Sequence, residues 1–180
     1  GFVDDPLGFV RFAFQWGEGV LAGFKGPLAW QCEYLRELGE ETKKRRFNRL
    51  DAVPPIQMAT ASGHGIGKSA LTAMIVLWIM STRPHARGVI TANTAIQLES
   101  KTWAELAKWA KRCVNQHWWR VNSGRGSMKM VHVSHSEDWR VEGQTCREEN
   151  SESFAGLHAL TSTPFFIFDE ASAIPDKIWE

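Results

Sequence analysis

Apolar residues along the chain follow two spacings, one typical of helices and one typical of strands. The helical spacing occurs in three stretches: 28–38, 68–81 and 94–114. Short apolar runs typical of strands occur in three others: 56–60, 88–92 and 165–168. From the first strand-like run onward, strands and helices alternate. This order predicts an α/β fold with a mostly parallel sheet and helices on both faces.

Local signals add detail to this outline. Pro54 and Pro55 break the chain, and we divide it there into residues 1–50, a lead-in with one helix, and residues 51–180, a core. Thr94 and Gln97 fit a capping box at the start of a helix. That helix is expected to bury one apolar face, formed by Trp103, Leu106, Ala107, Ala110 and Val114. The Gly- and Ser-rich middle of the chain predicts one or two strands with loops.

A glycine-rich segment, Ser-Gly-His-Gly-Ile-Gly-Lys-Ser at 62–69, stands between a predicted strand and a predicted apolar helix. It fits the phosphate-binding pattern G-x-x-x-x-G-K-[ST] except that Ser62 replaces the first glycine. Small residues let backbone N–H groups surround phosphate oxygens, and the helix N-terminus adds positive potential. Lys68 is expected to reach the β- and γ-phosphates of ATP, and Ser69 to bind Mg²⁺. The predicted nucleotide-binding residues here are Ser62, Gly63, His64, Gly65, Ile66, Gly67, Lys68 and Ser69. The alternative is a glycine-rich turn that happens to precede a lysine.

A second motif is the apolar run Phe165–Phe168 followed by Asp169 and Glu170. A buried strand that ends in two acids resembles a Walker B motif. Asp169 is then expected to face the Mg²⁺ beside Ser69, and Glu170 to polarise the attacking water as the catalytic base. The alternative is a core strand followed by a solvated acidic turn. Together with the glycine-rich segment, which would be the Walker A motif, the pair predicts an ATP-hydrolysing protein.

Three further features are ambiguous from sequence alone. Gln31 could hydrogen-bond adenine, or it could be a surface residue of an amphipathic helix. The basic run Lys43–Arg49 could hold DNA phosphates, but such runs are more often solvated helix faces. His132 and His135 are close, but no acid or cysteine spacing around them makes a convincing metal site, and we assign no zinc.

Composition narrows the class of protein. The chain has 21 basic and 20 acidic side chains, for a net charge of +1, so any nucleic-acid surface has to be local. The three cysteines are far apart, which favours reduced thiols in an intracellular compartment. The longest apolar run, Ala70–Met80, is too short to cross a bilayer. Because the chain begins at Gly1 and stops where we expect a new helix to start, we expect a fragment of a longer protein.

Four stretches give the chain a specific resemblance that runs from about residue 5 to the end. They are ASGHGIGKSAL at 61–71, STRPHARGVITANTAIQLESKTWAELAKW at 81–109, NSESFAGLHA at 150–159 and FFIFDEASAIPDKIWE at 165–180. Together they resemble the ATPase domain of the terminase large subunit of tailed phages and prophages. The resemblance implies a P-loop NTPase fold of the ASCE or RecA-like type, truncated after Walker B, with ATP and Mg²⁺ as cofactors.

The resemblance also implies a function and partners. The expected function is a motor that translocates viral double-stranded DNA into a procapsid in the cytoplasm of the bacterial host. The expected partners are the DNA, a portal protein, a small terminase subunit and other copies in a homo-oligomeric ring, with no membrane. Lys68, Ser69, Asp169 and Glu170 would keep the roles given above, and Gln31 resembles the adenine-side glutamine.

Two departures from the family matter. The arginine that many members carry inside the phosphate-binding loop is absent, since Gly63 and His64 stand there. The coupling motif and nuclease domain that follow Walker B in the family are also absent, so no nuclease activity is expected. The alternative function is another DNA-stimulated P-loop ATPase, such as a helicase-like protein. A nucleotide-binding module without turnover is a third class, against which Glu170 argues.

Overall fold

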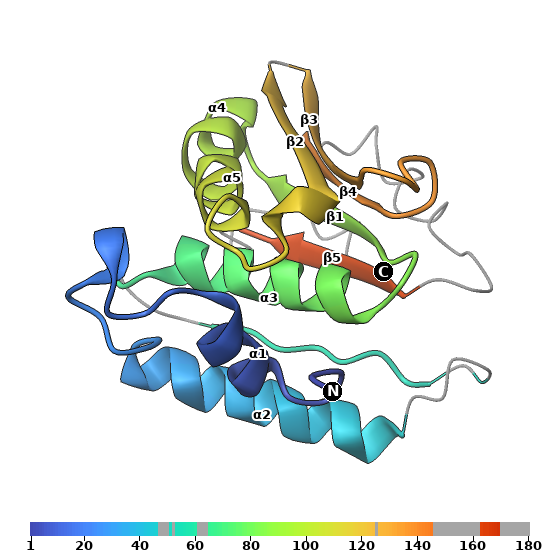
Figure 1. Ribbon diagram of the computed structural model, residues 1–180. Coiled ribbons are helices and arrows are strands. Elements are labelled where there is room, and N and C mark those ends of the chain that lie inside the picture. The colour runs from blue at the N-terminus through green and yellow to red at the C-terminus, as the bar shows by residue number, and fades with distance from the viewer. Residues whose placement is uncertain (47–50, 52, 61–64, 125, 146–162, 170–180) are drawn as a thin grey trace.

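The computed structural model describes residues 1–46, 51, 53–60, 65–124, 126–145 and 163–169. Within these residues a five-stranded sheet packs with helices, which confirms a mixed α/β architecture (Figure 1). The α-helices are α1 (Pro6–Ala13), α2 (Ala29–Arg45), α3 (Lys68–Thr82), α4 (Ala95–Gln97) and α5 (Ala104–Ala110). Three short turns of other helix types are the 3₁₀ turns η1 (Gly19–Leu21) and η3 (Gln116–Trp118) and the π-helical η2 (Leu98–Trp103). The strands are β1 (Arg87–Ala92), β2 (Trp119–Gly124), β3 (Ser127–His132), β4 (Arg140–Thr145) and β5 (Pro164–Phe168).

The sheet is mixed, and the prediction of a mostly parallel sheet is wrong. Its order is β2-β3-β4-β1-β5, with β1 parallel to both β4 and β5, and β3 antiparallel to both β2 and β4. The antiparallel half follows from short connections, because parallel neighbours need a crossover of a dozen or more residues. Gly126, at φ 77°, makes the tight β2–β3 turn. On the parallel side, Gly88 is required because a Cβ there would stand 2.1 Å from the Phe165 ring.

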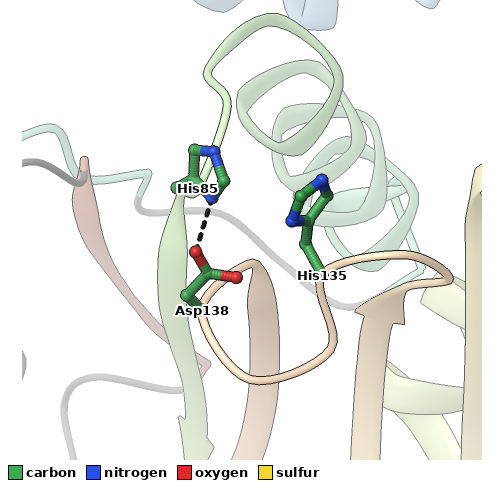
Figure 2. Close-up of side chains that lie close together, drawn as sticks. All are labelled: His85, His135 and Asp138. Atoms are coloured by element: carbon green, nitrogen blue, oxygen red, sulfur yellow. Dashed lines mark ion pairs between the residues drawn. The ribbon is translucent and has the colours of Figure 1, made fainter.

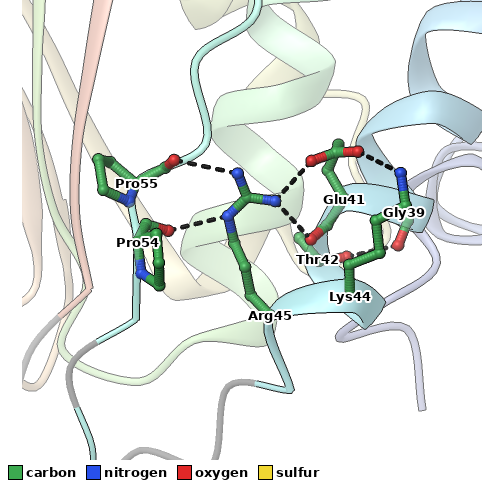
Figure 3. Close-up of polar contacts among 7 residues, drawn as sticks. All are labelled: Gly39, Glu41, Thr42, Lys44, Arg45, Pro54 and Pro55. Atoms are coloured by element: carbon green, nitrogen blue, oxygen red, sulfur yellow. Dashed lines mark hydrogen bonds and ion pairs between the residues drawn. The ribbon is translucent and has the colours of Figure 1, made fainter.

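The predicted strand at 56–60 is not formed, which is a second correction. Residues 53–60 run between α2 and α3 and pair with no strand (Figure 1). Arg45 of α2 explains part of this, because its guanidinium donates hydrogen bonds to the Pro54 and Pro55 carbonyls at 2.8 and 3.1 Å (Figure 3). Ile56 and Met58 pack against the core. The alternating apolar pattern of this segment is therefore satisfied by packing and not by a sheet.

The basic run before this segment is largely ion-paired where it is described. Lys43 pairs with Glu40, and Lys44 pairs with Glu41 on the same face of α2. Arg45 donates to a Glu41 carboxylate oxygen at 2.5 Å and to the Glu41 carbonyl at 3.0 Å. The two exposed lysine pairs contribute little stability, so the lysines belong to a solvated helix face, whereas the contact between Arg45 and Glu41 is partly buried. Arg49 lies outside the described residues.

The core centres on α3, whose side chains are buried on nearly all sides. Its fully buried residues include Val76, Leu77 and Trp78, and α5 packs closely against it. The N-terminal segment joins this core, since Trp78 Nε1 donates to the Phe2 carbonyl at 2.7 Å. The helix from Thr94 matches its predicted cap, and Thr94 Oγ1 accepts a hydrogen bond from Gln97 N at 3.2 Å. None of the helices in the described ranges is long and apolar enough to span a bilayer.

Candidate functional site

The candidate site lies at the end of the sheet where β1 and β5 end, and parts of both predicted motifs lie at this end. Helix α3 leads directly into β1, and β5 runs parallel to β1. The start of α3 therefore lies at the edge where β1 and β5 end, on the left of Figure 1. This topology brings Lys68 and Ser69, at the first turn of α3, to the same edge as Asp169, which directly follows β5.

The part of the glycine-rich segment that the structure describes begins at Gly65. Gly65 and Gly67 have φ values of 79° and 90°, a left-handed conformation that side chains with a Cβ rarely adopt. Gly67 caps the N-terminus of α3 and makes the turn from the loop into the helix. The predicted residues Ser62, Gly63 and His64 lie outside the described residues.

Helix α2 anchors this loop through two side chains. Gln31 Nε2 donates to the Gly67 carbonyl at 2.9 Å, while Gln31 Oε1 accepts from Leu28 N at 2.9 Å. Next to it, Trp30 Nε1 donates to the Ile66 carbonyl at 3.1 Å. Gln31 is only 2% exposed, so it is not a surface residue. Its amide ties α2 to the loop, and its predicted contact with adenine stays a prediction.

The same helix contacts the segment that leads into the loop. The phenol of Tyr34, one turn after Gln31, hydrogen-bonds the Thr60 side chain, and burial raises the pKa of this phenol. Two successive turns of α2 thus contact the chain on both sides of the loop, at Thr60 before it and at Gly67 where it joins α3. The loop is supported from α2 even though residues 53–60 form no strand.

Asp169 is fixed at its position by two contacts. Its backbone N donates to the Thr91 carbonyl of β1 at 2.9 Å, which continues the pairing of β5 with β1. Its carboxylate accepts a short hydrogen bond from the Thr102 hydroxyl of η2. Thr102 is 1% exposed and Asp169 is half-buried, so the contact is partly buried. Glu170, the predicted catalytic base, lies outside the described residues.

Thr102 and Trp30 are site residues that the sequence reading missed. Thr102 is 67 positions from Asp169, so no local periodicity relates the two. It lies in the π-helical turn η2, a departure from α-helical geometry that is frequent at functional sites. The only sequence signal was its place in the Lys-Thr-Trp part of the segment that resembles terminases.

One comparison with known proteins found a phage protein to which the chain is similar. It is 29% identical over 120 residues to a protein named "Probable terminase, large subunit" from Enterobacteria phage P7. The match covers 66% of this chain and 24% of the relative, so the chain corresponds to about a quarter of that protein. The resemblance to terminase large subunits indicated by the motifs is thereby confirmed. No family model matches the chain, and no solved structure matches it.

Proposed function

We propose that the chain is the ATP-binding and ATP-hydrolysing motor domain of a terminase large subunit, with a P-loop NTPase fold, which translocates viral double-stranded DNA into a procapsid. The observation that supports the proposal is the topology, because the start of α3, with Gly67-Lys68-Ser69, and the end of β5, followed by Asp169, lie at the same end of the sheet. Similarity to a phage terminase large subunit supports the DNA-packaging role.

The chemistry assigns a role to each residue of the site. Backbone N–H groups of residues 62–69 would bind the phosphates of ATP, with Lys68 neutralising charge on the β- and γ-phosphates. Ser69 and Asp169 would bind Mg²⁺ through their oxygen atoms, which are the ligands Mg²⁺ prefers. Glu170 would accept a proton from the attacking water.

Two buried side chains would position these groups without touching the nucleotide phosphates. The hydroxyl of Thr102 donates a hydrogen bond to one carboxylate oxygen of Asp169. This bond favours a single orientation of the carboxylate and so of its second oxygen. The amide of Gln31 holds the Gly67 carbonyl. Because catalysis of phosphoryl transfer depends chiefly on positioning and charge, such supports matter for rate.

The partners follow from the proposed motor role. Double-stranded DNA would be the translocated substrate, and a portal protein and a small terminase subunit would complete the machine as a homo-oligomeric ring. The residue that stabilises transition-state charge would come from elsewhere in the chain or from a neighbouring subunit. The cytoplasm of the bacterial host is the proposed location.

The proposal is tested by ATP turnover with Mg²⁺ in the chain and in the variants Lys68→Ala, Asp169→Asn and Glu170→Gln. We expect each variant to lower the turnover number by at least a hundredfold. Lys68→Ala should also weaken ATP binding, whereas Glu170→Gln should leave binding nearly unchanged because only the chemical step loses its base.

A matched control is Lys108→Ala, which removes an exposed lysine paired with Glu105 on α5. It should keep wild-type turnover.

The variant Thr102→Val should bind ATP but require more Mg²⁺ for half-maximal turnover, while Thr102→Ser should behave as wild type. If Lys68→Ala binds ATP as tightly as the unaltered chain, the phosphate-binding role of the loop is wrong.

A further inference from the structure

The opposite end of the sheet carries a cluster of three potential metal ligands. His85, His135 and Asp138 each present a ligand atom, and these three atoms lie within 4.8 Å of one another (Figure 2). His85 precedes β1 by two residues, and Asp138 precedes β4 by two residues. Because β1 and β4 are parallel with Arg87 paired to Arg140, their amino ends bring the two side chains together.

We propose that His85, His135 and Asp138 form a binding site for a divalent transition-metal ion, and that Zn²⁺ is the ion this site prefers. Two imidazoles and one carboxylate are a donor set that suits zinc, with water in the fourth position of a tetrahedron. This donor set does not suit Mg²⁺, which prefers oxygen ligands alone. The site is therefore chemically distinct from the candidate nucleotide site as well as remote from it.

The distances require only small side-chain movements. In a tetrahedral zinc site with bonds of about 2.0–2.2 Å, neighbouring ligand atoms stand roughly 3.3 Å apart. Here His85 Nδ1 lies 2.7 Å from Asp138 Oδ2. Rotations about side-chain bonds are sufficient to bring the three atoms to tetrahedral separations, since His135 and Asp138 are exposed and free to adjust.

The state of His85 supports a ligand role. Its Nδ1 atom is buried and makes no hydrogen bond of acceptable geometry, although it faces the Asp138 carboxylate. Its backbone adopts φ 62°, a left-handed conformation that is uncommon for residues other than glycine. A metal ion would provide the buried His85 nitrogen with a bonding partner. A role in metal binding would also account for the unusual backbone conformation of this residue.

The backbone around the cluster is already held in place. Arg140 N donates to the Ala86 carbonyl at 3.1 Å, and Arg87 Nη2 donates to the Glu137 carbonyl at 2.8 Å. Within the loop, Trp139 N donates to the His135 carbonyl at 3.0 Å. These bonds join the turn before β1 to the loop before β4. Ligands on a fixed backbone lose less conformational freedom when an ion binds.

An aromatic floor lies beneath the cluster. Trp139 is 8% exposed, and its ring centroid lies 5.6 Å from that of His85 and 6.3 Å from that of His135. His132 stacks on the same tryptophan at 4.3 Å. These ring contacts keep the imidazoles of the cluster close to one another, while the His135 side chain stays exposed.

The test is zinc binding by tag-free chain that has been stripped with a chelator. Zn²⁺ is titrated against a competing indicator, and Co²⁺ is used as a spectroscopic substitute whose visible absorption bands report tetrahedral coordination. We expect one equivalent of tightly bound metal, intense Co²⁺ bands and a higher Tm with zinc. His135→Ala, Asp138→Asn and His85→Asn should each weaken binding at least tenfold and abolish the rise in Tm.

His85→Asn is chosen because asparagine tolerates the left-handed conformation, so the turn should keep its shape. Circular dichroism checks the fold of each variant, and His117→Ala, which removes an exposed histidine outside the cluster, is the matched control and should bind zinc like the unaltered chain. The proposal is overturned if the unaltered chain does not bind zinc. It is also overturned if folded His85→Asn and His135→Ala bind zinc as well as the control does.

Discussion

At the scale of single residues, the site depends on buried side chains that bond backbone or carboxylate groups. Gln31 illustrates this, because both ends of its amide are engaged, one by Leu28 N and the other by the Gly67 carbonyl. A nearly inaccessible glutamine in such a position acts on the loop and needs no contact with a ligand of its own. The sequence analysis considered Gln31 as an adenine contact or as a surface residue, whereas in the structure it is buried and holds the loop.

A substitution at Gln31 separates loop positioning from recognition of adenine. Gln31→Ala removes both bonds, so the free energy of unfolding should fall by about 1–3 kcal/mol. If the residue positions the loop, ATP and GTP binding should weaken by the same factor in calorimetric titrations. A selective loss of ATP binding would instead establish the adenine contact. Gln116→Ala, at an exposed position, is the control.

The thiol of Cys113 should be unreactive in the folded chain. It is 1% exposed, and burial raises its pKa to about 11, although backbone hydrogen bonds from Asn115 and Val114 act in the opposite direction. Because the thiolate is the reactive form, only about one molecule in a thousand is reactive at pH 8. Mass spectrometry after alkylation at pH 8 should find Cys113 unmodified in the native chain and modified in urea. Rapid labelling without urea would contradict the burial.

At the scale of elements, long-range contacts determine some strands and helix ends that local sequence patterns do not predict. Helix α3 and strands β1 and β5 lie close to their predicted ranges, because each is a distinct apolar run. The middle of the chain forms three strands, β2, β3 and β4, where one or two were predicted. Strand β4 is hard to recognise from sequence because Arg140–Thr145 contains a single strongly apolar residue, Val141, which is fully buried. Its strand form depends on pairing between β3 and β1. Val114 is 57% exposed, not buried as predicted, because the helix ends before it.

The same limit applies to the candidate site. Gly67, Lys68 and Asp169 could be found because each belongs to a motif with a fixed spacing. Thr102 could not, because its bond to Asp169 arises from tertiary packing. The cluster of His85, His135 and Asp138 was missed for the same reason, since His85 is far from the other two in sequence and only the parallel register brings them together.

The contact between α2 and residues 53–55 gives a prediction at this scale. Arg45→Ala removes the bonds to the Pro54 and Pro55 carbonyls and to Glu41, so the free energy of unfolding should fall by about 1–3 kcal/mol. Urea denaturation measures the change. Lys44→Ala is the control one residue away, and it should leave the midpoint nearly unchanged because its ion pair is exposed. Equal midpoints for both variants would refute the role of Arg45.

At the scale of the whole molecule, the lead-in and the core share one hydrophobic cluster. Phe9 and Leu35 from residues 1–50 belong to the same buried cluster as Trp78 and Trp109. The backbone is also tied across the division, since Val114 N donates to the Ala13 carbonyl at 2.8 Å. The proposed division at residue 50 therefore separates two parts that are packed together.

Shared packing predicts a single cooperative unfolding transition. Urea denaturation followed by far-ultraviolet circular dichroism and by tryptophan fluorescence should give coincident curves, because neither part retains its core without the other. The single tyrosine, Tyr34, provides a third probe near the junction. Two separated transitions would mean that residues 1–50 and 51–180 fold independently.

The rate of ATP hydrolysis with and without linear double-stranded DNA tests most directly whether the chain is an ATP-driven motor that acts on DNA. We expect Mg²⁺-dependent turnover that rises several-fold with DNA and is absent in Lys68→Ala under both conditions. A turnover rate that is the same with and without DNA would support an ATPase but not a motor that acts on DNA. Turnover that persists in Lys68→Ala would contradict the proposed site itself.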